Sequence, residues 1–192
     1  MLAKSFLIFL LAATTPLVAQ TGEKLVISAR KQVGVTQYYD PVYRTLEFPN
    51  GDVPADRGVC TDVVIRAMRD ALTRDLQQLV NQDMRANFSA YPKNWGLSKT
   101  DKNIDHRRVP NLQTYFKRKG YQLPLGKEKD ATKFLPGDIV TCTVPPNLPH
   151  IMLVSDKKTD AGVPLVIHNI GNGTHEEDYL FDFPLTGHYR VK

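Results

Sequence analysis

The sequence predicts an α+β domain in which helices come first and an antiparallel sheet follows. Apolar residues recur at helical spacing through the first part of the chain. From Pro136-Gly137-Asp138 onward they form short extended runs separated by turn residues. Strands that follow one another without intervening helices favour an antiparallel meander over a parallel sheet.

The first 19 residues predict a secretory signal peptide. Lys4 precedes the apolar run 6–13, and a small residue, Ala19, stands at the expected cleavage point. The apolar run is too short to cross a bilayer comfortably, and no second run of about 18 apolar residues follows, so we expect no stable membrane insertion. Residues 20–192 then form a single domain, exported to the periplasm or secreted, because about 170 residues suit one core.

The helices are predicted from their apolar stripes. A first helix covers residues 25–33, and Gly34 ends it; residues 38–58 contain Pro and Asn-Gly breakers and are predicted as loop. The stripe within residues 63–72 predicts a second helix, with Cys60 one turn before Val64 at the edge of the core. Third and fourth helices are expected over 76–88 and 112–116.

Three strands are predicted after the helices. They cover residues 139–144, 151–154 and 164–169, where β-branched and apolar residues predominate. Residues 171–174 are predicted as a turn. The charged segment 175–178 carries metal-ligand residue types but lacks the histidine spacing of a zinc site, so we expect a charged turn and no metal.

Cys60, His150 and His168 are the residues most indicative of chemistry. A thiol at a helix start, followed later by imidazoles on strands, is the layout of a cysteine hydrolase. The positive end of the helix and a neighbouring imidazolium are expected to lower the thiol pKa. Asp62, in the first turn, is a like charge that acts in the opposite direction.

These residues stand in motifs that carry a family resemblance. The segments Val59-Cys60-Thr61-Asp62, Pro136-Gly137-Asp138-Ile139, His150-Ile151-Met152 and Ile167-His168 resemble, in this order, the NlpC-type branch of papain-like cell-wall peptidases. Residues 57–62 and 103–112 resemble more closely a bacterial family catalogued as a domain of unknown function. Val59 and Thr61-Asp62 replace the Asp and Ser-Gly that usually flank the cysteine of NlpC-type enzymes.

The resemblance implies a papain-like fold and hydrolysis of amide bonds in peptidoglycan stem peptides. It implies Cys60 as nucleophile, His150 as base and His168 as the residue that orients the base. Tyr38 is expected as a side-chain donor to the oxyanion beside the Cys60 N–H, and Arg107, within the 105–108 block, as a ligand of substrate carboxylates. We expect no cofactor, a monomer, and a peptidoglycan or other envelope amide as substrate.

Two other readings remain open. With two cysteines in an exported chain, a structural Cys60–Cys142 disulfide in a non-catalytic envelope binding protein is the alternative from another class. An acyltransferase or amidase acting on another envelope amide would keep the nucleophile and change the substrate. The formal net charge of +5 is too small for a nucleic-acid-binding footprint.

Overall fold

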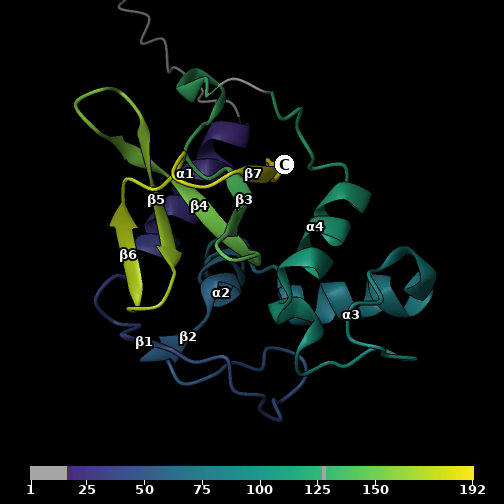
Figure 1. Cartoon of the computed structure of the whole chain (residues 1–192). Coiled ribbons are helices and arrows are strands. Elements are labelled where there is room, and N and C mark those ends of the chain that lie inside the picture. The colour runs from purple at the N-terminus through teal and green to yellow at the C-terminus, as the bar shows by residue number, and fades with distance from the viewer. Residues whose placement is uncertain (1–16, 127–128) are drawn as a thin grey trace, which may run out of the picture.

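The structure, a computed structural model, describes residues 17–126 and 129–192 and has the predicted α+β architecture (Figure 1). The helices are α1 (Leu17–Arg30), α2 (Cys60–Leu72), α3 (Leu76–Ala86) and α4 (Val109–Arg118). The main strands are β3 (Ile139–Val144), β4 (Leu148–Lys158), β5 (Pro164–Asn169), β6 (Thr174–Glu177) and β7 (Leu185–Tyr189). They form one sheet in the order β6-β5-β4-β3-β7, in which every neighbouring pair is antiparallel.

The two faces of this sheet pack against different parts of the chain. Because side chains alternate along a strand, Ile151 and Leu153 of β4 face α1 and α2, whereas Met152 and Val154 face the opposite way. The second face is covered by Phe134 and by the segment around Leu180. Both sets of side chains are fully buried, so burial on both faces fixes the register of β4.

Helices α3 and α4 lie together on one side of the molecule, opposite the β6 edge (Figure 1). A short 3₁₀ turn, η2 (Asp105–Arg107), precedes α4 and contacts α2 and α3. A small parallel pair, β1 (Tyr38–Tyr39) with β2 (Arg57–Gly58), closes the loop before α2. The first residue of α2 therefore sits where η2, β2 and β4 meet.

The helix and strand predictions are largely confirmed, but the short strands β1 and β2 lie within residues 38–58, which were predicted as loop, and α1 ends at Arg30 rather than at residue 33. Strands β3 and β5 have the predicted bounds, and α2 begins at Cys60. The prediction of a charged turn at residues 175–178 is wrong, because Thr174–Glu177 form β6 and pair with β5. An edge strand needs apolar side chains on few positions, so its polar sequence resembles a turn.

Only the end of the predicted signal peptide falls within the described residues. Residues 1–16 lie outside them, and Leu17, Val18 and Ala19 form the start of α1. The cleavage site therefore stays a prediction. Within the described part of the chain, no helix combines the length and the apolar character needed to span a membrane.

Candidate active site

Cys60 is the first residue of α2 and lies at the bottom of a cleft of about 210 Å³. Its exposed fraction is 4 %, and the backbone N–H of Ile151 on β4 interacts with its thiol. Since Ile151 follows His150 in the strand, the thiol lies beside the backbone of the predicted base. The N–H of Cys60 has no acceptor within the helix, because it belongs to the first turn.

The two predicted histidines are brought together by neighbouring strands. His150 on β4 and His168 on β5 are 4 % and 1 % exposed, and His150 Nε2 lies 2.8 Å from His168 Nδ1. His168 Nε2 lies 3.1 Å from Glu177 Oε1 on β6. Adjacent antiparallel strands thus align a row of three side chains, Glu177, His168 and His150, across the sheet.

This row determines which nitrogen of each ring carries a proton. A carboxylate only accepts hydrogen bonds, so Glu177 takes the N–H of His168 Nε2. A neutral His168 then has an acceptor at Nδ1, which receives the N–H of His150 Nε2. The Nδ1 of His150 is left unprotonated, which is the state a general base requires.

Burial controls the protonation of both the thiol and the base. Desolvation raises the pKa of Cys60 to about 12, and Asp62 adds a smaller rise. Desolvation, followed by the charge of His168, lowers the pKa of His150 to about 3. The expectation of a lowered thiol pKa is therefore wrong, because the cost of burying a charge exceeds the stabilisation by the helix start. In the resting protein the Cys60 thiol and the His150 imidazole are both neutral.

This protonation state predicts how Cys60 reacts with alkylating reagents. In a Cys142→Ala background, the rate of carbamidomethylation by iodoacetamide should rise about tenfold per pH unit from pH 7 to 10, because only the thiolate reacts. Mass spectrometry of the Cys60 peptide measures this rate, and circular dichroism at each pH verifies the fold. A rate that levels off below pH 8 would contradict a thiol pKa raised by burial.

Asp62 and Arg107 form a buried ion pair under the cleft. Arg107 Nε and Nη2 donate to the two carboxylate oxygens of Asp62 at 3.0 and 2.9 Å, and Nη2 also donates to the carbonyl of Asp40. The Asp62 carboxylate additionally accepts the Val59 N–H at 2.6 Å, which fixes the backbone entering α2. Arg107 was predicted as a substrate ligand. The structure places it at the cleft but engages its guanidinium with Asp62.

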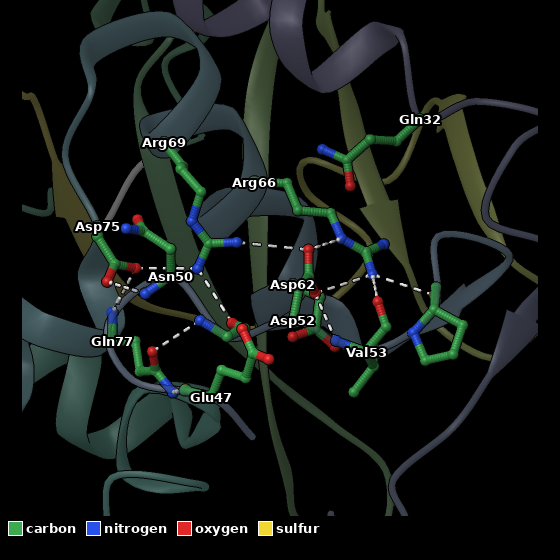
Figure 2. A network of polar contacts seen from close by, with 12 residues as sticks. Gln32, Glu47, Asn50, Asp52, Val53, Asp62, Arg66, Arg69, Asp75 and Gln77 are labelled. Carbon is green, nitrogen blue, oxygen red and sulfur yellow. Dashed lines mark hydrogen bonds and ion pairs between the residues drawn. The ribbon is translucent and has the colours of Figure 1, made fainter. Parts of the chain in front are cut away.

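A second network fastens the loop that leads to Cys60 (Figure 2). Arg66 of α2 contacts the Asp52 carboxylate at 2.9 Å and the Arg57 carbonyl at 3.0 Å. Arg69, one turn further, binds Asp75, while the side chain of Gln77 accepts the Gly51 N–H. These bonds tie the loop to α2 and α3, so the backbone before the nucleophile is held from both helices.

Tyr39, rather than the predicted Tyr38, lines the cleft. Tyr38 is 56 % exposed, and its ring lies 5.8 Å from the Arg57 guanidinium. Burial, together with the nearby Cys60 and Asp62, raises the pKa of Tyr39 to about 12, so its phenol stays a donor at neutral pH. Tyr38 and Tyr39 are adjacent in a strand, so their side chains point to opposite sides. A one-residue error in the expected register therefore selects the wrong one of the two.

One further residue of the site was not identified from the sequence. Glu177 was assigned to a turn, and only the pairing of β6 with β5 reveals its contact with His168. Asn169 follows His168 in β5, so strand alternation directs it to the opposite face of the sheet. There its amide donates to the carbonyl of Gly58, 111 residues away in the sequence, at 3.1 Å and braces the segment before α2.

The structure contains both cysteines as free, buried thiols. Cys60 belongs to the core between the helices and the sheet, and Cys142 to the core on the second face. Within the described ranges, no three His, Cys, Asp or Glu side chains gather as ligands for a metal ion. The structure therefore places a free thiol at the start of α2, against the backbone of the strand that carries His150 and the row of side chains behind it.

Comparison with known proteins identifies the fold and the family of the chain. The chain is similar to the crystal structure of an N-acetylmuramoyl-L-alanine amidase from Bacteroides uniformis, with a TM-score of 0.50, 13 % identity, and coverage of 90 % of this chain and 100 % of that one. The structure of NlpC1 from Trichomonas vaginalis gives a TM-score of 0.44 at 15 % identity over 89 % of this chain, which spans 45 % of that protein. The first of these confirms a papain-like α+β fold.

The sequence relatives are more similar. The uncharacterized protein YijF of Escherichia coli K12 is 50 % identical over 172 residues, which are 90 % of this chain and 82 % of that protein. The family described as a domain of unknown function, DUF1287, matches residues 26–191. The chain therefore belongs to the DUF1287 family and folds as a papain-like domain.

Proposed function

We propose that this protein is an exported cysteine hydrolase that cleaves amide bonds in peptidoglycan stem peptides. The observation that carries the proposal is the row Glu177, His168 and His150, which ends at a strand position beside the thiol of Cys60. The fold shared with a protein named as an N-acetylmuramoyl-L-alanine amidase supports the substrate class.

The proposed reaction begins with a proton transfer. His150 Nδ1 accepts the thiol proton as the sulfur of Cys60 forms a bond to the amide carbon. Because burial disfavours both a thiolate and an imidazolium, proton transfer accompanies the attack, so that negative charge passes to the carbonyl oxygen. The amine then leaves with the proton from His150, and water hydrolyses the thioester.

The oxyanion has two proposed donors. The N–H of Cys60 points out of the first turn of α2, where the helix dipole also favours negative charge. The Tyr39 hydroxyl lines the same cleft and takes the role that was predicted for Tyr38. Each such donor is worth about 3 kcal/mol of transition-state stabilisation in known acyl-transfer enzymes.

Digestion of purified peptidoglycan tests the proposal. The wild-type protein should release fragments with newly formed carboxyl and amine termini, which mass spectrometry of the soluble products identifies. Cys60→Ala should lower the rate by at least about 10³-fold, because it removes the nucleophile. Cys142→Ala is the matched control and should retain activity.

Two results would decide against a hydrolase. Undiminished digestion by Cys60→Ala would exclude this nucleophile. Absence of new termini with the wild-type protein, together with retained binding to peptidoglycan, would favour the envelope binding protein. Export is tested separately, by determining the N-terminal residue of the protein recovered from the periplasm, which we expect to be Gln20.

A further inference from the structure

The cleft at Cys60 has a one-sided charge distribution, and the inference drawn from it rests on the proposed hydrolysis of a peptide amide. Two arginines, Arg107 and Arg108, line the cleft, and no acidic residue among those that the structure describes does so. Helix α4 begins at Val109, which also lines it, so the N-terminal ends of α2 and α4 both meet there. Helix N-termini favour negative charge.

The two arginines differ in how accessible their N–H donors are to a ligand. Nε and Nη2 of Arg107 are engaged by the Asp62 carboxylate and the Asp40 carbonyl, and the side chain is only 2 % exposed. Arg108 contacts the Asp105 carboxylate through Nη1 at 3.2 Å. Within the part of the chain that the structure describes, Nε and Nη2 of Arg108 have no acceptor. Arg108, whose side chain is 17 % exposed, therefore offers more accessible donors to a ligand than the buried, ion-paired Arg107.

Trp95 holds the Arg108 guanidinium in place. The guanidinium carbon lies 4.1 Å from the centre of the Trp95 ring, which is 38 % exposed and itself lines the cleft. Such stacking orients the plane of the guanidinium while leaving its edge free, because the ring occupies only one face. An oriented guanidinium edge matches the two oxygens of a carboxylate.

We propose that Arg108, stacked on Trp95, is the subsite for a carboxylate that the substrate carries next to the scissile amide. The substrate is thus an acidic peptide, bound with its negative group at the α4 side of the cleft and its carbonyl at Cys60. The prediction of a carboxylate ligand in the 105–108 block moves by one residue, from Arg107 to Arg108.

A pair of peptides that differ in one group tests the subsite. The first is L-alanyl-γ-D-glutamyl-L-lysine, and the second is the same peptide with the glutamyl α-carboxylate converted to an amide. Calorimetric titration of Cys60→Ala protein should give about tenfold tighter binding of the carboxylate peptide, as expected for one charge-assisted bidentate contact. Trp95 is the one tryptophan of the chain, so its fluorescence should change with the same affinity.

Variants of Arg108 test whether this residue causes the difference in affinity between the two peptides. Arg108→Gln in the same Cys60→Ala background should bring the ratio of the two affinities to about one. Arg108→Lys should retain part of the preference, because the positive charge remains but the planar, bidentate guanidinium is lost. Arg85→Gln, an exposed arginine on α3 outside the cleft, is the matched control and should keep the full ratio. Equal affinities for the two peptides, or discrimination that Arg108→Gln leaves intact, would overturn the subsite.

Hydrolysis of the same peptides by the wild-type protein separates this inference from the proposed function. Discrimination in binding without cleavage would support the subsite and overturn the hydrolase. Cleavage of both peptides without discrimination in binding would support the hydrolase and overturn the subsite. A calorimetric difference with silent Trp95 fluorescence would place the carboxylate elsewhere and also overturn the subsite.

Discussion

Replacing His150 by alanine is expected to lower kcat by about 10³-fold, because it removes the proposed general base. The thiol of Cys60 has a pKa raised to about 12 by burial, so very little thiolate is present at pH 7 without the base. Kinetics on a peptide amide measure the loss. The residual activity of His150→Ala should rise with pH, since hydroxide then replaces the imidazole as proton acceptor.

The size of the effect should decrease along the row of side chains. His168→Ala leaves the base in place but removes the group that fixes its tautomer, so its loss should be smaller than that of His150→Ala. Glu177→Gln, at the half-exposed end of the row, should cause the smallest loss of activity. His175→Ala, an exposed histidine on β6, is the matched control and should behave as wild type. A His168→Ala protein with full activity would contradict the orienting role.

Replacing Arg107 by methionine is expected to lower the free energy of unfolding by about 3–5 kcal/mol, because it leaves the Asp62 carboxylate buried without its partner. The side chains of the pair are 2 % and 4 % exposed, and the two bonds between them are 3.0 and 2.9 Å long. Urea denaturation followed by circular dichroism measures the change.

Two variants separate the buried charge from the loss of packing. Adding Asp62→Asn to Arg107→Met should recover part of the stability, since a neutral amide still accepts the Val59 N–H but buries no charge. Lys31→Met breaks an ion pair with Asp70 whose side chains are 65 % and 53 % exposed, and it should cost less than about 1 kcal/mol. Equal costs for Arg107→Met and Lys31→Met would show that burial does not govern the pair.

Local patterns were sufficient for the elements that carry Cys60 and His168. The stripe Val63, Val64, Ala67 and Met68 predicted α2 with Cys60 at its first turn, and apolar runs predicted β3 and β5 with their observed bounds. Such patterns report burial, which is a property of each segment and its period. The edge strand β6 was missed because its sequence Thr-His-Glu-Glu has little apolar content.

No local sequence pattern predicted which residues the charged side chains would contact. Arg107 is 45 residues from Asp62, so nothing in the sequence distinguished it from Arg108 as the arginine already engaged. The choice between Tyr38 and Tyr39 depended on one residue of register in a two-residue strand. The pKa of Cys60 was mispredicted because helix position is visible in the sequence, whereas the depth of burial is not.

The sequence by itself therefore determined the α+β class, the position of Cys60 at a helix start and the order of the residues Cys60, His150 and His168. The tertiary structure alone decided that Glu177 completes the row behind His150, that Asp62 neutralises Arg107, and that Arg108 keeps free donors at the cleft. The physical reason is that periodicity and capping act between neighbours in the chain. Hydrogen bonds and desolvation depend on contacts between residues that only folding brings together.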